Sequence, residues 1–172
     1  MDTAMAAWDI QELSEGRFTL GLGTQVKAHI VRRFSGTWGP PAARMREYVQ
    51  ALRSIWDCFQ NGTKLDVRGE HYNLSLTIPY FNPGPMEHPN IPVYVAAVGP
   101  LMSRVAGEVC DGLTWHTFHT VKYLREVVVA NARAGAEKTG RDPDSLKFVG
   151  SCYYVTGDTD EELERGRQEQ RK

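Results

Sequence analysis

The sequence predicts an α/β fold built around a parallel sheet. Short apolar runs rich in β-branched residues alternate along the chain with amphipathic helical patterns, and no internal repeat of fixed period breaks this alternation. A parallel sheet must be covered on its faces, and the interleaved helices can supply that cover. With 172 residues, 41% of them apolar, the chain is long enough for one domain with a sizeable core.

Four apolar runs are the expected parallel strands. They are residues 17–23, 91–98, 112–116 and 146–156, and we expect the last three to be buried. A long connection follows the first run, and its glycines and prolines, from Gly36 to Pro41, indicate a surface loop.

The helices are expected between these strands. The first is residues 3–13, which Ser14-Glu15-Gly16 ends, and the clearest begins at Ala42 and ends at Asn61-Gly62. Its apolar residues recur at spacings of three and four. They are Met45, Tyr48, Val49, Leu52, Ile55, Trp56 and Phe59. Proline opens a third helix at residue 100, whose expected inner face is Leu101, Met102, Val105, Ala106 and Val109. A fourth covers residues 121–139, and a further helix follows residue 158, with a wholly polar tail over residues 164–172.

The segment between residues 60 and 90 interrupts the strand and helix alternation. Residues 65–67 and 71–74 alternate around Arg68-Gly69-Glu70, which predicts a small hairpin. The proline-rich stretch 79–92 is expected to be irregular or polyproline in form.

Charge and composition argue against several classes of partner. Twenty basic and twenty-one acidic residues leave a net charge of −1, so we expect no nucleic acid partner. Neither a signal segment nor a membrane span is apparent, and we expect a cytoplasmic location. Cys58, Cys110 and Cys152 lie far apart among apolar residues, so we expect small buried side chains and neither disulfides nor a metal knuckle.

Three ordered motifs carry a family resemblance. They are GRFTLGLGT at residues 16–24, IPVYVAAVGP at residues 91–100 and AGEVCDG at residues 106–112. Together they resemble the luciferase-like monooxygenase family, closest to the branch that uses the deazaflavin coenzyme F420. The resemblance extends from Trp8 to about Leu163.

The resemblance implies a partial TIM (β/α)₈ barrel. The four strands would be the fourth to the seventh, and residues 1–172 would form a single incomplete barrel domain with the hairpin segment as an insertion. A whole barrel takes about 250 residues. We therefore expect three further strands before Met1 and one after Lys172.

The cofactor site is expected at the carboxyl ends of the strands, where the following loops converge. A helix starts at Pro100, so the backbone N–H groups of the preceding Val98-Gly99 corner favour binding of a phosphate. The alternative is a tight turn that binds no ligand. The resemblance agrees, although family members often have two glycines there. The expected cofactor-binding residues are Gly23, Thr24, Gln25, Ala97, Val98 and Gly99.

The first strand ends in a different glycine pattern. Gly21 and Gly23 do not make a dinucleotide fingerprint, because Val26 stands where the third glycine is required. They could instead admit a cofactor close to the backbone, with Thr24 donating its hydroxyl, or simply leave packing space. Gln25 follows the position where some deazaflavin-dependent relatives place an acid, and glutamine cannot serve as a proton donor.

His116 and His119 are the candidate catalytic residues, as proton donors or as phosphate or substrate contacts. A capping or packing role is the alternative, and their HxxH spacing lacks a third ligand, so no metal is expected. A basic group in the long loop could meet an anionic coenzyme tail or simply be solvated. It consists of Lys27, His29, Arg32 and Arg33. Trp56 is expected in the core, while Trp115 could flank a planar ring.

The function predicted is hydride transfer between reduced F420 and a small organic substrate, without a metal. An oxygen-activating monooxygenase that uses FMN is the alternative within the class. From a different class, the chain could be an inactive half-barrel that only self-associates, because four strands leave two open edges; we expect a homo-oligomer. An unrelated doubly wound sheet is a third possibility, and neighbouring strands in chain order would favour the barrel.

Overall fold

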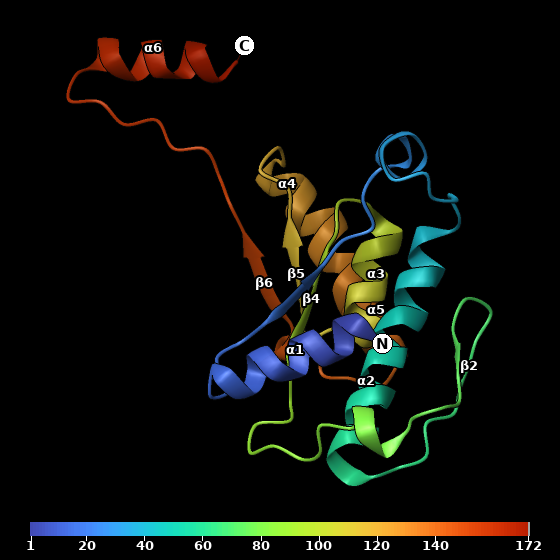
Figure 1. The fold of residues 1–172 in the computed structure, drawn as a ribbon. Helices are drawn as coiled ribbons and strands as arrows, with labels where there is room; N and C mark the ends of the chain where they lie inside the picture. The colour runs from blue at the N-terminus through green and yellow to red at the C-terminus, as the bar shows by residue number, and fades with distance from the viewer. Residues whose placement is uncertain (172) are drawn as a thin grey trace.

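The computed structural model describes residues 1–171 (Figure 1). Four strands form its main sheet: β1 (Leu20–Leu22), β4 (Val93–Ala96), β5 (Gly112–Trp115) and β6 (Lys147–Gly150). All three pairings are parallel and the order is β1-β4-β5-β6. Neighbours therefore follow chain order, which confirms the arrangement expected of a barrel segment and argues against a doubly wound sheet.

The helices form a layer beside this sheet. They are α1 (Asp2–Leu13), α2 (Pro41–Asn61), α3 (Pro100–Val109) and one long helix assigned in three parts, α4 (Val121–Tyr123), a π-helical segment (Leu124–Val129) and α5 (Ala130–Lys138). Figure 1 shows α2, α3 and α5 gathered on one side of the strands. The strands bury Val93, Val95 and Leu113 in the core. The alternate residues Ala96 and Val149 are exposed, so the sheet has one covered and one open face.

Glycines set the distance between α3 and α5. A Cβ at Gly107 would overlap the carbonyl of Ala132, and one at Gly135 would overlap the carbonyl of Arg104. The two helices therefore meet backbone to backbone. Because α3 follows β4 directly, this contact also fixes where the start of α3 lies over the sheet.

The insertion contains the predicted hairpin. Strands β2 (Val67–Arg68) and β3 (Asn73–Leu74) pair antiparallel, and a 3₁₀ turn (Pro79–Phe81) follows within the proline-rich stretch. The long connection after β1 is less irregular than expected, because it contains a π-helical turn (His29–Arg33). A second 3₁₀ turn (Pro143–Ser145) precedes β6.

The C-terminal part of the chain departs most from expectation. The strand predicted over residues 146–156 ends at Gly150 and lies at the sheet edge, so the expectation of a buried strand was wrong. The chain then runs away from the sheet to α6 (Asp160–Gln170), none of whose residues is buried (Figure 1). Cys152 on this segment is exposed, against the prediction that it is buried. Within residues 1–171 no strand pairs with the outer edge of β6, which accounts for both differences.

Other core predictions hold in part. The run 91–98 was expected to be buried, but Ala96 and Val98 are exposed, because one face of the sheet is open. Trp56, Cys58 and Cys110 are buried as expected, and burial raises the pKa of the Cys110 thiol to about 12. Leu101, predicted to line the inner face of α3, is exposed because it lies in the first turn, beyond the packed part of the helix. Among residues 1–171, no helix is long and apolar enough to cross a membrane.

Candidate functional site

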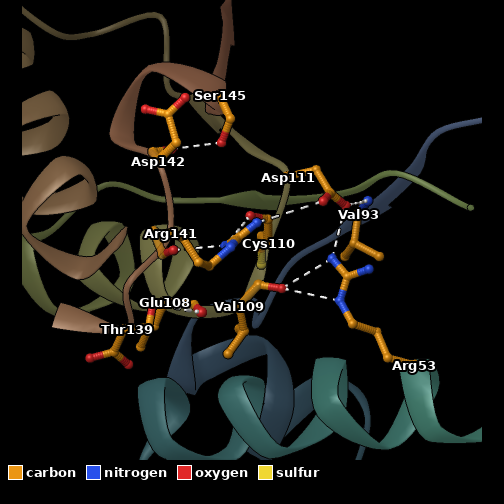
Figure 2. A network of polar contacts seen from close by, with 11 residues as sticks. Arg53, Val93, Glu108, Val109, Cys110, Asp111, Thr139, Arg141, Asp142 and Ser145 are labelled. Carbon is orange, nitrogen blue, oxygen red and sulfur yellow. Dashed lines mark hydrogen bonds and ion pairs between the residues drawn. The ribbon is translucent and has the colours of Figure 1, made fainter. Parts of the chain in front are cut away.

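The two ends of the sheet differ in character, and the amino end is closed by a polar network (Figure 2). The Asp111 carboxylate accepts hydrogen bonds from the Val93 backbone N–H at 2.7 Å and from the Arg53 guanidinium at 2.9 Å. Arg53 also donates to the Val109 carbonyl, and Arg141 donates to the Cys110 carbonyl at 2.7 Å. These bonds tie α2 and the segment after α5 to the starts of β4 and β5. This end is therefore structural, as is usual for the amino side of barrel strands.

The carboxyl end of β4 opens at the predicted corner. Gly99 is the N-cap of α3 and provides no side-chain cap, and Pro100 follows it. Within residues 1–171, four backbone N–H groups here have no protein acceptor: those of Val98, Gly99, Leu101 and Met102. A Cβ added to Gly99 would meet no atom within 4 Å, so the space beside this residue is free. The corner therefore has the donors and the room that an anion requires.

Ala97 and Val98 differ in what they offer to a ligand. Ala97 is fully buried, and its N–H donates to the Thr114 carbonyl at 2.9 Å. Val98 is exposed, and its carbonyl accepts a hydrogen bond from the Tyr123 hydroxyl at 3.2 Å. The helix α4, which ends the loop after β5, is thereby attached to the corner.

The two predicted histidines lie on that loop. His119 packs against Tyr123, with ring centroids 5.2 Å apart, and is thus one side chain away from Val98. Its Nδ1 contacts the His116 carbonyl at 2.6 Å; since a carbonyl only accepts, Nδ1 carries the proton and Nε2 is left free. His116 stacks instead on the exposed Phe118.

A cavity of about 440 Å³ lies at the carboxyl end of β1, the neighbour of β4 in the sheet. Gly23 and Thr24, both predicted site residues, contribute to its wall, and a Cβ on Gly23 would lie 3.7 Å from the Ala96 side chain of β4. The full lining is Leu22, Gly23, Thr24, Ile30, Thr37, Trp38, Gly39, Pro41, Arg44, Met45, Tyr48 and Tyr72. The cavity and the corner therefore occupy the ends of adjacent strands.

The hairpin insertion supplies one wall of this cavity. Tyr72 packs against Tyr48 of α2 with centroids 5.3 Å apart, and the Tyr48 hydroxyl donates to Thr3 at 2.6 Å. The Glu47 carboxylate accepts the backbone N–H groups of Glu70, His71 and Tyr72 at 3.2, 2.8 and 3.3 Å. The hydrogen bond from His71, helped by the other two, holds the pKa of Glu47 below its ordinary value.

Glu47, Glu70 and His71 also bring three candidate ligand atoms within 4.8 Å of one another. The Glu47 oxygens already accept three backbone N–H groups, which accounts for the cluster as the attachment of the hairpin to α2. The His71 Nε2 is buried and has no hydrogen-bond partner within residues 1–171. We assign no metal to this cluster.

The remaining predicted residues lie outside the cavity. Gln25 has a positive φ of 56° and contacts His29 through its side chain at 3.0 Å. Lys27, Arg32 and Arg33 share the same exposed loop, and Arg33 lies over the Phe34 ring. Trp115 packs on the helix side of the sheet, close enough to Gly150 that a Cβ there would overlap its indole. Its ring is thus occupied with packing.

Sequence reasoning missed three residues of the cavity, Arg44, Trp38 and Tyr72. Arg44 lies on the polar side of α2, and Tyr72 belongs to a hairpin that is remote in the chain. Aromatic residues on both α2 and the insertion were the available signal, but their meeting depends on the hairpin folding back onto α2.

Comparison with known proteins agrees with this fold. A family model described as luciferase-like monooxygenase matches residues 1–171. The chain is 44% identical over 163 residues to an uncharacterised protein of Mycobacterium tuberculosis, covering 95% of the chain and 48% of that protein. It is 32% identical over 165 residues to the 5,10-methylenetetrahydromethanopterin reductase of Archaeoglobus fulgidus, covering 96% of the chain and 45% of that reductase. The chain thus spans about half the length of these relatives.

Solved structures show the same fold. A coenzyme F420 dependent tetrahydromethanopterin reductase from Methanopyrus kandleri superposes with a TM-score of 0.70 at 21% identity, covering 95% of this chain and 49% of that one. A riboflavin lyase solved with modified FMN and riboflavin superposes with a TM-score of 0.74 at 17% identity, covering 98% of this chain and 41% of that one. The four parallel strands therefore match about half of a fold of this type. The chain belongs to the luciferase-like monooxygenase family.

Proposed function

We propose that this chain carries part of the active site of an F420-dependent oxidoreductase, which transfers a hydride between the deazaflavin and a small organic substrate. The single observation that supports it most is the uncapped start of α3. There, four backbone N–H groups without an acceptor in residues 1–171 lie at the end of β4, the strand next to the one whose end borders the cavity. A relative named as an F420-dependent glucose-6-phosphate dehydrogenase, 30% identical over 155 residues, favours the deazaflavin.

The corner would hold the cofactor through its phosphate. Backbone N–H groups of Val98 and Gly99 and the positive end of the α3 dipole favour an anion without any basic side chain. The Tyr123 hydroxyl holds the Val98 carbonyl and thereby fixes the corner. When bound, a deazaflavin supplies the ring carbon that gives or takes the hydride.

The cavity would hold the reacting groups away from water. Its walls are mostly apolar, and the Thr24 hydroxyl can orient a polar group at the end of β1. His119 is the proposed proton carrier, since its Nδ1 is engaged with the His116 carbonyl and its Nε2 is free to exchange a proton with substrate. His116 would then act by positioning His119.

A substitution at Gly99 tests the corner directly. Gly99 is the N-cap, where aspartate is among the best residues, so Gly99→Asp should preserve or raise the melting temperature. The same carboxylate would occupy and repel the anion site. We expect F420 affinity, measured by fluorescence titration of the 172-residue chain, to fall at least about tenfold.

Gly99→Ser is the matched control, because serine caps the helix without a charge. Its F420 affinity should stay within about threefold of the unchanged protein, a difference below 1 kcal/mol. Equal binding by the aspartate and serine variants would show that the cofactor does not use this corner. Failure of both F420 and FMN to bind the unchanged chain would contradict the proposed function as a whole.

An FMN-dependent monooxygenase is the second candidate. The corner would hold the phosphate of either cofactor, and a structure of the same fold was solved with modified FMN. Titrating both cofactors against the same preparation separates the two. Tighter binding of FMN than of F420 would replace the first proposal with the second.

A further inference from the structure

We propose that the cavity beside β1 binds an organic anion with a planar apolar body, and that Arg44 is the residue that recognises its charge. This inference rests on the proposed function, because it takes the cavity as the substrate side of that site. It goes further by giving the substrate a chemical class.

Aromatic side chains give the cavity flat walls. Trp38, Tyr48 and Tyr72 line it, together with the aliphatic side chains of Leu22 and Met45. The two tyrosines are held in place from outside the cavity: Tyr48 by its hydroxyl bond to Thr3, and Tyr72 by the bond from its backbone N–H to Glu47. Walls that are ordered before binding favour a rigid planar molecule over a flexible chain.

Arg44 is the only charged residue among those that line the cavity, and no acidic side chain accompanies it. It takes part in none of the ion pairs within residues 1–171, which use other arginines and lysines. Its guanidinium lies along the Gly39 side of the opening, where a Cβ would be 4.0 Å from Nη1. An unpaired guanidinium beside aromatic walls favours a carboxylate or phosphate and disfavours a cation.

The cavity is separate from the phosphate corner. None of the corner residues lines it, and its volume of about 440 Å³ lies within the usual range for a small-molecule site. The sheet thus presents two places for negative charge, backbone N–H groups at the end of β4 and a side chain beside the end of β1. The first suits the cofactor and the second suits the substrate.

A matched pair of probes tests the charge requirement. 2-Naphthoate and the neutral 2-naphthamide have the same planar body, and calorimetric titration of the 172-residue chain compares them. We expect the carboxylate to bind at least about tenfold more tightly. Arg44→Gln should remove this preference, while Arg44→Lys should keep part of it, because lysine retains the charge without the planar fork.

Arg165→Gln is the control variant, since Arg165 is an exposed arginine of α6, remote from the cavity lining. It should bind both probes like the unchanged protein, and melting curves verify that every variant is folded. Equal affinity for the two probes, or an unchanged preference in Arg44→Gln, would overturn the proposal.

Separate cofactor titrations distinguish this proposal from the proposed function. F420 binding without naphthoate binding would refute only the organic-anion site. Naphthoate binding without F420 or FMN binding would refute only the redox assignment. If F420 displaces naphthoate and Arg44→Gln weakens both equally, Arg44 serves the cofactor and the substrate class inferred here is wrong.

Discussion

The backbone N–H of His71 donates to the Glu47 carboxylate at 2.8 Å, and this bond attaches the hairpin insertion to the helix that borders the cavity. Two neighbouring N–H groups, of Glu70 and Tyr72, share the same carboxylate. A Cβ at Gly69 would overlap this carboxylate, so the turn approaches α2 as closely as only glycine permits. The position of Tyr72 in the cavity wall therefore depends on this carboxylate together with the packing of Tyr72 on Tyr48.

Glu47→Gln should loosen the hairpin without unfolding the protein. The amide keeps one acceptor oxygen but replaces the other with a donor that faces backbone N–H groups. We expect the amides of residues 70–72 to exchange about tenfold faster in hydrogen exchange, since hydrogen bonds to charged groups are the stronger ones. Glu70→Gln is the control, because the Glu70 side chain is exposed and accepts none of these bonds; similar exchange in both variants would contradict this attachment.

The attachment should also depend on pH. Hydrogen bonding to His71 lowers the pKa of Glu47 in the folded state, so its contribution is complete above the ordinary glutamate range. It is lost as the pH falls through the lowered value, which places the change below about pH 4. The amide chemical shift of His71, followed by NMR, should titrate in this range in the unchanged protein and stay flat in Glu47→Gln. A flat profile in both would refute the linkage.

Glu108 is expected to contribute to global stability. Its carboxylate is buried between Arg46 and Lys138. Burial alone would raise its pKa, but hydrogen bonds from Lys138 and Arg46, with their charges, outweigh this and keep the pKa below its ordinary value. Glu108→Gln should lower the free energy of unfolding by about 2 kcal/mol. This loss lies between those typical of surface and of buried ion pairs, because Arg46 and Lys138 both reach solvent.

The loss of stability caused by Glu108→Gln should disappear at acid pH. The stabilisation by Glu108 is present above the ordinary glutamate range and vanishes as the pH falls through the lowered pKa, below about pH 4. Urea unfolding at neutral and acid pH should therefore show the variant and the unchanged protein converging. Glu137→Gln, at an exposed position of α5 outside the ion pairs found, should behave like the unchanged protein at both pH values.

Gly107→Ala tests the contact between α3 and α5. The added methyl group would overlap the Ala132 carbonyl, so the helices must separate, and we expect a loss of about 2–3 kcal/mol in the free energy of unfolding. Gly99→Ala, with a φ of −103° and free space around its Cβ, should cost far less in the same urea titration. Equal costs at the two positions would mean that the helices are not in backbone contact.

Local sequence patterns were sufficient to predict most of the helices and strands. β4 and β5 were predicted within two residues at each end, because runs such as Val93 to Ala96 are apolar and end at glycine or polar residues. α2 was predicted within two residues, since its apolar stripe and the closing Gly62, with a φ of 67°, are local signals. β6 was predicted too long because Tyr153 and Tyr154 have high strand propensity, whereas strand formation also needs a neighbour to pair with.

The candidate site likewise contains residues that local sequence predicts and residues that it does not. The corner at Gly99 could be predicted from a strand followed by Gly-Pro, which is a local signal for a helix start. Arg44 and Tyr72 could not, because each looks like an ordinary surface residue of its own element. They line one cavity because Glu47 and the packing of Tyr72 on Tyr48 attach the hairpin to α2, and these contacts join residues more than twenty positions apart.

The open sheet should make the 172-residue chain self-associate. Within residues 1–171, β1 and β6 each pair on one side only, and Val149 of β6 is exposed on the uncovered face. Unpaired strand edges beside apolar surface favour addition of another chain. Static light scattering should give a mass above the monomer at roughly micromolar concentrations, where exposed edges begin to associate.

Val149→Lys should shift the mass toward the monomer, because an inward-pointing charge on an edge strand opposes pairing. Thr156→Lys adds the same charge outside the sheet and should leave the mass unchanged. A monomeric mass for the unchanged chain would show that the edges are protected and would remove the case for a self-associating half-barrel.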